Sequence, residues 1–321
     1  MPSDLTHNQY ELNTGISMHV AEQGAGIPVI MCHGFPELWY SWREQMAPVA
    51  AAGFHAMAPD QRGYGDTSCP PEVEDYTQEK ICGDLVSLLD AIGAPKGVFV
   101  GHDWGGAVVW NMALHHPDRV HAVAGVNTPF SPHPPVDPQA AMEADPGRFD
   151  YQLYFQDVGK AEAEFEADVE RSFKLMFRSS RPEDAIPGRT GTAGVRERGG
   201  LFVGTPQEIS KSEMLAQEEL DYFAEKFRKT GFRGGLNWYR NHRRNWEWGK
   251  STAGTKLAMP ALMVTAANDA VLLPSMTEGM EEWVPNLTRG HIENCAHWTQ
   301  QEQPEELNRI LVDWLRTLPK N

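Results

Sequence analysis

Long apolar runs, cysteine and positive charge are all scarce in this sequence. No stretch of about twenty apolar residues, the length that crosses a bilayer, occurs in its 321 residues. The segment 1–15 is polar and lacks the pattern of a secretory signal peptide, in which positive charge precedes an apolar stretch. We therefore expect a cytoplasmic protein without a membrane span.

Only four cysteines are present, and they form no Cys-x-x-Cys pair. They are Cys32, Cys69, Cys82 and Cys295. In a cytoplasmic protein we expect them to stay reduced and to have structural roles. His291, Cys295 and His297 are close in sequence, but their spacing fits no zinc pattern. The sequence thus predicts no metal site and no other cofactor.

Basic residues number 28 against 44 acidic ones, which gives a formal net charge of −16. This charge repels phosphate backbones and anionic lipid surfaces, so nucleic acid is not an expected partner. The length and the 41% hydrophobic content suit one large domain, or one domain with an insertion. Neither feature indicates an oligomeric state.

Short apolar runs that end in turn residues alternate with helical patterns. The runs are Pro28–Cys32, His55–Pro59, 98–101 and Ala261–Ala266. Such runs are typical of strands buried on both faces of a parallel sheet. Apolar residues recur at helical spacing over 76–92 and again after Pro304. The alternation predicts an α/β fold with a mostly parallel central sheet flanked by helices.

This alternation stops between residues 131 and 256. A proline-rich entry (SPHPPVDP) leads into helical, charged and aromatic sequence, including 214–230. We interpret 131–256 as a helical cap inserted into a core domain formed by 1–130 and 257–321. Within the cap, 181–200 is rich in Gly and Arg and has no periodicity, which predicts a mobile loop.

The segment GHDWGG, with Asp103 and Trp104 at its centre, follows the apolar run GVFV and precedes the helical pattern AVVWNMAL. A strand, a tight turn and a helix in succession resemble the nucleophile turn of the α/β-hydrolases. The glycines let strand and helix approach, and the following helix N-terminus favours an ionised Asp103. Serine attack on a saturated carbon would leave a stable ether, whereas a carboxylate forms an ester that water can cleave. Asp103 is therefore the candidate nucleophile, and an aspartate at an ordinary tight turn is the alternative.

The segment His33 to Pro36 (HGFP) supplies a candidate partner of Asp103. It follows the strand PVIMC. From there Phe35, together with Trp104, is expected to donate a backbone N–H to an oxyanion. Taken alone, HGFP is also compatible with a plain loop that contains a cis proline.

Asp269 follows the strand ALMVTA, and His297 lies between the strand-like segment LTRGHI and the last helix. The order nucleophile, acid, histidine is the order in α/β-hydrolases. We expect His297 to deprotonate the hydrolytic water and Asp269 to orient and stabilise the imidazolium. Glu293 is a competing carboxylate, but it does not end a buried strand.

With these residues, the chain resembles the soluble epoxide hydrolases almost from end to end, and in particular the C-terminal hydrolase domain of the mammalian enzymes. The segments that carry the resemblance are HGFPELWYSWR, DQRGYGDTS, GHDWGG, NTPF, FDYQLYFQ, GFRGGLNWYRN, PALMVTAAND and GHIENCAHWTQ. The resemblance implies conversion of a hydrophobic epoxide and water to a vicinal diol through a covalent ester of Asp103. It also implies that Tyr151 and Tyr239, on the cap, hydrogen-bond the epoxide oxygen. Without the resemblance, both would be amphipathic core residues.

Three other functions compete with this interpretation. A haloalkane dehalogenase also uses Asp followed by Trp, but such enzymes usually carry Asn where Phe35 stands and lack the tyrosine pair. A haloacetate dehalogenase would need arginines beside the nucleophile, where Trp104 and Ala107 stand. A binding protein on the same fold would have lost a catalytic residue, and none is missing.

Overall fold

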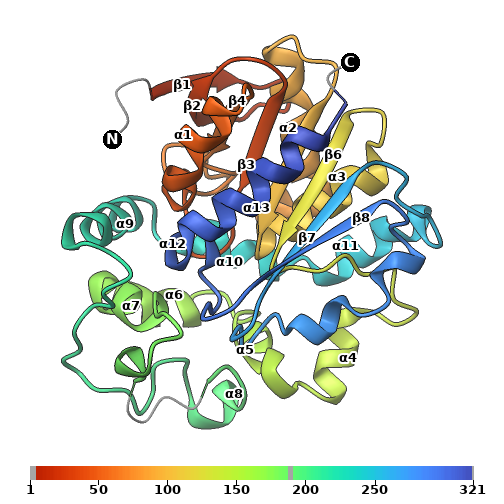
Figure 1. Ribbon diagram of the computed structural model, residues 1–321. Helices are drawn as coiled ribbons and strands as arrows, with labels where there is room; N and C mark the ends of the chain where they lie inside the picture. The colour runs from red at the N-terminus through yellow and green to blue at the C-terminus, as the bar shows by residue number, and fades with distance from the viewer. Residues whose placement is uncertain (1–4, 187–190, 320–321) are drawn as a thin grey trace.

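In the computed structural model, which describes residues 5–186 and 191–319, eight strands form one sheet in the order β1-β2-β4-β3-β5-β6-β7-β8 (Figure 1). The strands are β1 (Thr6–Glu11), β2 (Ser17–Gly24), β3 (Pro28–Cys32), β4 (His55–Pro59), β5 (Gly97–His102), β6 (Val120–Val126), β7 (Ala261–Ala266) and β8 (Leu287–Ile292). Strand β2 pairs antiparallel with β1 and β4, and all other neighbours are parallel. The predicted mostly parallel sheet is confirmed.

The four apolar runs are strands β3, β4, β5 and β7, and nearly all their residues are buried. Of the other four strands, β8 is the strand-like segment LTRGHI, whereas β1, β2 and β6 were not identified from the sequence. Strand β1 is polar (THNQYE) and has no buried residue, because it forms one edge of the sheet. It therefore carries no apolar signal, and only its pairing with β2 defines it.

Helices cover both faces of the sheet. On one face lie α1 (Arg43–Ala51), α12 (Thr299–Glu302) and α13 (Pro304–Thr317), and on the other lie α2 (Gln78–Ala91) and α3 (Trp104–His115). Each face has its own apolar cluster, with Leu311 and Trp314 of α13 in one and Leu85 of α2 in the other. Helices α2 and α13 confirm the two helices predicted from apolar spacing. Pro304 stands in the first turn of α13, where no backbone N–H is required.

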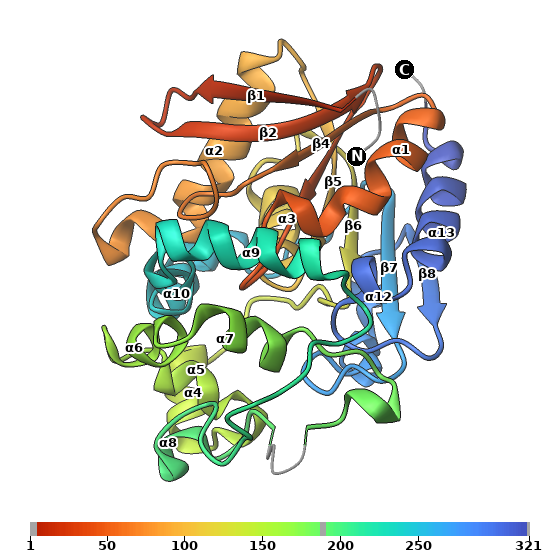
Figure 2. The same cartoon turned by 90° about the vertical axis from the view of Figure 1, so that its left-hand side faces the viewer.

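The helices between β6 and β7 form a cap beyond the carboxyl ends of the parallel strands (Figures 1 and 2). They are α4 (Pro138–Ala144), α5 (Asp150–Tyr154), α6 (Lys160–Glu166), α7 (Val169–Met176), α8 (Val195–Arg198), α9 (Gln217–Thr230), α10 (Arg233–Tyr239) and α11 (His242–Gly249). The helix expected within 214–230 is α9. The domain limits at 131 and 256 stay a prediction.

The prediction that 181–200 is a loop is wrong in part. It contains a 3-10 turn at Pro182–Asp184 and helix α8. Helix α8 is held by Asp150, whose carboxylate accepts bonds from the backbone N–H (2.8 Å) and Nε (2.6 Å) of Arg196. Asp150 and Arg196 are 46 positions apart, so the local sequence of this segment gives no sign of the contact that holds the helix. Residues 187–190 lie outside the described residues, and the mobility of the segment stays a prediction.

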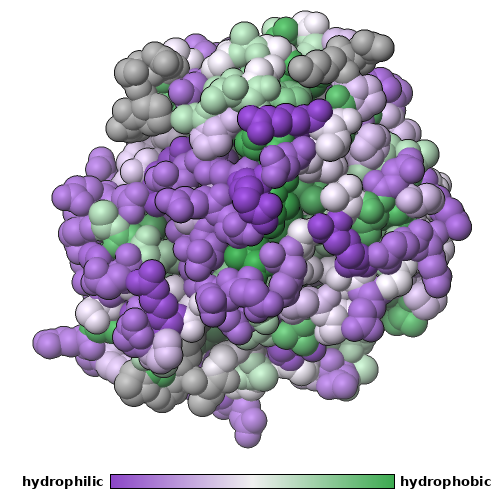
Figure 3. Space-filling model, viewed as in Figure 1, coloured by the Kyte–Doolittle hydropathy of each residue, from purple (hydrophilic) through white to green (hydrophobic). Residues whose placement is uncertain are grey.

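Hydrophilic side chains cover most of the face of the molecule seen in Figure 3. In the described part of the chain, four large hydrophobic residues are exposed, and no two of them are neighbours in sequence: Val136, Val158, Val203 and Met276. None of the helices described there is long and apolar enough to cross a membrane.

Candidate active site

Asp103 occupies a sharp turn between β5 and α3. Its backbone has φ 52° and ψ −123°, a conformation that non-glycine residues rarely adopt. Gly101 and Gly105 make the turn possible: a Cβ on Gly101 would lie 2.1 Å from the Gly105 oxygen, and one on Gly105 would lie 2.1 Å from the Cys32 oxygen. The strained turn directs the Asp103 carboxylate into the cavity at the ends of the strands.

Backbone N–H groups hold one oxygen of this carboxylate. Phe35 donates its N–H to Asp103 Oδ1 at 2.9 Å, and the backbone N–H of Trp104 also interacts with the carboxylate. Gly34 leaves the space for this approach, because a Cβ there would lie 2.4 Å from Asp103 Oδ1. The Phe35–Pro36 peptide bond is cis. The structure thus brings the two predicted donors to the same carboxylate.

His297 lies between two carboxylates. Its Nδ1 is 2.9 Å from Asp269 Oδ2, and its Nε2 is 3.7 Å from Asp103 Oδ2. The other oxygen of Asp269, Oδ1, accepts the backbone N–H groups of Val271 (2.8 Å) and Leu272 (2.9 Å). The nucleophile, histidine and acid predicted from the sequence therefore lie in a row.

Burial and charge shift the pKa values of this row in different directions. Burial raises the pKa of Asp103, although the charges of His297 and His102 and the two N–H donors oppose the shift. Burial also acts to lower the pKa of His297, but the charge and hydrogen bond of Asp269, with the charge of Asp103, raise it to about 9. At Asp269, burial is outweighed by the charge of His297 and by hydrogen bonds, so its pKa falls. At neutral pH, His297 is therefore a cation beside the Asp269 anion.

Asn127 is a further site residue to which the sequence analysis gave no role. Its Nδ2 donates to Asp269 Oδ2 at 2.7 Å, while its Oδ1 accepts the hydroxyl of Thr299 at 2.7 Å. Its φ of 62° lies in the left-handed region, which asparagine tolerates better than most residues. In the sequence, the segment NTPF contributed only to the resemblance. The signal that could have identified Asn127 is an asparagine, a residue that tolerates the left-handed conformation, directly after a buried strand.

A fully buried cluster of Glu37, His102 and Gln300 lies behind the site and was also missed. Glu37 Oε2 is 2.8 Å from His102 Nδ1 and accepts the Gly34 N–H at 2.9 Å, and Gln300 Nε2 donates to Glu37 Oε1 at 2.6 Å. The other nitrogen of His102, Nε2, is 2.7 Å from the backbone oxygen of His297. The cluster therefore links the Gly34 turn to the His297 loop. The three residues are far apart in sequence, so no local pattern predicts their contact.

Two cap helices bring the predicted tyrosines to the same cavity. Tyr151 on α5 and Tyr239 on α10 line it with Asp103 and His297, and its volume is about 260 Å³. Helix α10 can approach the core because Gly234 faces Gly63. A Cβ on Gly234 would lie 2.3 Å from the backbone oxygen of Gly63. Burial raises the pKa of both tyrosines, and the nearby charge of Asp103 adds to the shift. Both hydroxyls are therefore protonated at neutral pH.

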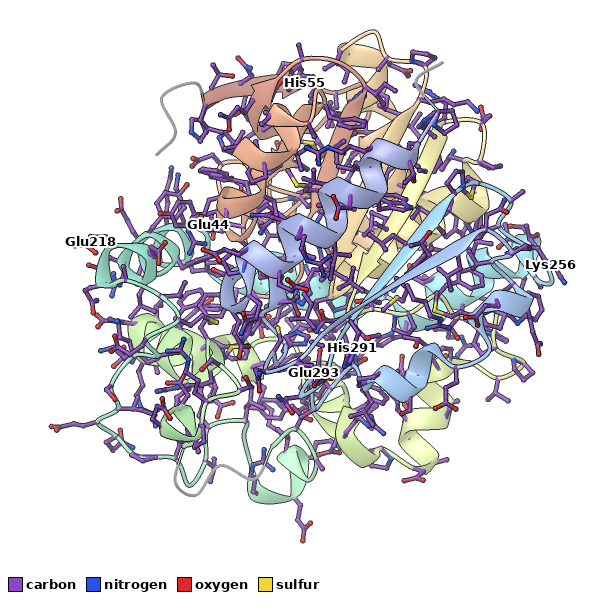
Figure 4. All side chains as sticks on the ribbon, viewed as in Figure 1. Glu44, His55, Glu218, Lys256, His291 and Glu293 are labelled. Carbon is purple, nitrogen blue, oxygen red and sulfur yellow. The ribbon has the colours of Figure 1, made fainter. Side chains whose placement is uncertain are left out.

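Other candidates from the sequence lie away from this cavity. Figure 4 labels His291 and Glu293, which follow one another closely at the end of β8. Glu293 is 78% exposed and its carboxylate is 3.5 Å from His291 Nε2. Neither residue lines the cavity. Over the described ranges, no three His, Cys, Asp or Glu side chains are grouped to hold a metal ion.

The parallel sheet, the strained turn after β5 and the loops at the strand ends define an α/β-hydrolase. A family model described as "alpha/beta hydrolase fold" matches residues 27–304. Among solved structures, the chain is similar to Epoxide Hydrolase A from Mycobacterium thermoresistibile, with a TM-score of 0.88 and 39% identity over 98% of this chain and 99% of that one. An epoxide hydrolase from Vigna radiata gives a TM-score of 0.85 and 34% identity over 99% of this chain and 100% of the other.

Curated relatives carry the same name. Bifunctional epoxide hydrolase 2 of Sus scrofa is 51% identical over 321 residues, which are 100% of this chain and 57% of the relative. Epoxide hydrolase A of Mycobacterium tuberculosis is 42% identical over 312 residues, 95% of each chain. The chain thus spans little more than half the length of its pig relative and nearly all of the mycobacterial one. It belongs to the epoxide hydrolases of the α/β-hydrolase family.

Proposed function

We propose that this protein hydrolyses epoxides to vicinal diols, with Asp103 as covalent nucleophile. The observation that carries the proposal is the content of one cavity: a carboxylate beside two N–H donors, a histidine–carboxylate pair, and two protonated tyrosines. The names of the relatives support the same reaction. We also propose a cytoplasmic location, from the sequence.

In the first half-reaction, Asp103 Oδ2 attacks a ring carbon of the epoxide. We assign the attack to Oδ2 because Oδ1 accepts the Phe35 N–H. The C–O bond of the ring breaks, and the leaving oxygen takes a proton from Tyr151 or Tyr239. A phenol is a suitable donor, because it is still protonated at neutral pH and can neutralise a strongly basic alkoxide.

Ester formation also prepares His297 for the second half-reaction. It removes the negative charge of Asp103, one of the charges that raise the pKa of His297. His297 can then give its proton to the tyrosinate, directly or through water, which leaves a neutral imidazole and a neutral phenol.

In the second half-reaction, neutral His297 takes a proton from water as the water oxygen attacks the Asp103 carboxyl carbon. The N–H groups of Phe35 and Trp104 stabilise the oxyanion. Collapse of this intermediate breaks the ester, and the diol oxygen takes up the second proton of the water. The Asp103 carboxylate and the His297 cation are thereby restored.

A single turnover in ¹⁸O-water tests the covalent route. The first diol should contain no label, because its new oxygen comes from Asp103, and Asp103 should acquire ¹⁸O. Peptide mass spectrometry of the 103-containing fragment and of the diol measures both. Label in the first diol would mean direct attack by water and would exclude the ester.

A halide leaving group is the alternative that the cavity disfavours. A departing halide needs no proton, so two buried phenol donors would have no chemical role in dehalogenation. Release of halide from a simple chloroalkane, faster than the opening of any epoxide, would reverse this conclusion.

A further inference from the structure

Glu302, on α12, has no role in the mechanism proposed above, yet its carboxylate contacts two separate parts of the molecule. Its Oε1 accepts the backbone N–H and the hydroxyl of Ser180, both at 2.6 Å. Its Oε2 accepts the backbone N–H of Ala296 at 2.8 Å. Ser180 belongs to the cap, and Ala296 directly precedes His297. One side chain therefore connects the cap to the loop that carries the proposed base.

The cap segment 176–180, at the end of α7, contacts the same loop a second time. The indole Nε1 of Trp298 donates to the backbone oxygen of Met176 at 2.8 Å. Within the cap, Asp184 holds this segment, because its Oδ2 accepts the backbone N–H of Ser179 at 3.0 Å. The segment is thus fixed to its neighbours in the cap, and it is hydrogen-bonded to the loop at two points.

The position of His297 must be accurate for the proposed second half-reaction. Its Nε2 is 3.7 Å from Asp103 Oδ2, which is longer than a normal hydrogen bond. A water must reach both this nitrogen and the carboxyl carbon of Asp103 when the ester is cleaved. A displacement of about 1 Å can slow such a reaction by about 100-fold. Contacts that fix the loop of His297 therefore affect the rate of this step.

We infer that Glu302 is a positioning residue for His297, and that it makes the position of this base depend on the position of the cap. The inference rests on the proposed function and adds a residue to it. Ester formation uses Asp103 and the two cap tyrosines, and none of these lies on the loop that Glu302 holds. Loss of the Glu302 contacts should therefore slow ester hydrolysis and spare ester formation.

Glu302→Gln tests this inference with little change in side-chain shape. A carboxylate offers two acceptor oxygens, whereas an amide offers one oxygen and an NH₂ group that only donates. The glutamine can therefore keep the bonds to Ser180 or the bond to Ala296, but not both. Under single-turnover conditions with an epoxide, ester hydrolysis should slow by roughly 10-fold and ester formation should change by less than about twofold. The ester should then accumulate, and intact-protein mass spectrometry measures it.

Two further variants separate this link from a general loss of stability. Glu305→Gln makes the same chemical change at an exposed position in the first turn of α13 and should alter neither step. Ser180→Ala removes one bond on the cap side and should slow ester hydrolysis less than Glu302→Gln does. In the Glu302→Gln background it should add little, because the link is already broken. Equal slowing of both steps in Glu302→Gln would assign Glu302 a structural role and overturn the inference.

Hydrogen exchange without substrate keeps the inference separate from the proposed function. Exchange of a backbone N–H reports local opening, and the N–H of Ala296 donates to Glu302. Exchange in the peptide that contains Ala296 should become severalfold faster in Glu302→Gln. It should also become faster in Ser180→Ala, although that change lies in the cap. Both results would support the link even if no epoxide were hydrolysed. A wild-type exchange rate of this peptide in either variant would contradict the inference, whatever the activity on epoxides.

Discussion

The core side and the cap side of the cavity position their functional groups by different means. On the core side, Asp269 accepts bonds from His297, Asn127 and two backbone N–H groups, and Asp103 accepts the Phe35 N–H. On the cap side, the ring of Tyr239 packs against the rings of Phe35, Trp104 and Phe155, with centroids 5.4, 5.0 and 5.0 Å away.

This difference follows from the charge of the groups. The core groups are a histidine and two carboxyl groups, and hydrogen bonds and neighbouring charges determine their pKa values. The cap donors are neutral phenols, and burial among aromatic rings keeps them protonated. In the proposed mechanism, the core side therefore supplies the nucleophile and the base, and the cap side supplies the acid. Four experiments test this division, taken from the largest expected effect to the smallest.

Loss of both tyrosine hydroxyls should nearly abolish epoxide opening. Tyr151→Phe or Tyr239→Phe alone should slow ester formation by about tenfold or more, roughly 1.4 kcal/mol, because each donor acts mainly in the transition state. The effects should not add, since both hydroxyls act on one oxygen. Stopped-flow tryptophan fluorescence under single-turnover conditions measures this rate. A wild-type rate of ester formation in the double variant would show that the two tyrosines of the cap are not the proton donors.

His297→Gln should spare ester formation and slow ester hydrolysis by on the order of 10²- to 10³-fold, because the imidazole activates water only in the second step. The ester should accumulate. Intact-protein mass spectrometry should show the added mass of the substrate, and Asp103→Asn serves as the control that forms no adduct. Normal turnover by His297→Gln would show that the base is another group.

The raised pKa of His297 predicts a pH-dependent contribution to stability. The pKa is about 9 in the folded protein against 6.5 for the unperturbed group, so the folded state binds the proton more tightly. This contribution is fully present below pH 6.5 and is lost as the pH rises through about 9. Urea unfolding of wild type and His297→Gln should therefore show a difference in free energy of unfolding that shrinks over this window, by on the order of 3 kcal/mol. A difference in free energy of unfolding that does not change with pH would contradict the raised pKa of His297.

Loss of the ion pair between Lys226 on α9 and Asp66 of the core should have the smallest effect on stability and activity. Lys226 is 21% exposed and Asp66 34% exposed, and pairs of this kind contribute about 1 kcal/mol or less. Lys226→Met should therefore change the free energy of unfolding by less than about 1 kcal/mol and leave kcat unchanged. The more exposed Lys229, 3.5 Å from Asp66, is the matched control. A large loss of activity would mean that this pair, and not apolar packing, holds the cap.

The sequence by itself identified the fold class and the residues at the strand ends. Asp103, Asp269 and Phe35 each follow a short apolar run, and runs of that kind are visible because their strands are buried on both faces. The carboxyl ends of parallel strands meet at one edge of a sheet, so the sequence also implied that these residues lie together. The roles of Tyr151 and Tyr239 came from resemblance, because an amphipathic tyrosine in a helix has no local mark of catalysis.

Only the tertiary structure decided which groups support that site. Gln300 donates to Glu37 across 263 positions of sequence, and Asn127 donates to Asp269 across 142. Arg178 also lines the cavity, in a segment that is hydrogen-bonded to Glu302 and Trp298. A hydrogen-bond partner is fixed by direction and distance in space, and local sequence patterns report burial and periodicity, so these contacts had no signature before the chain was folded.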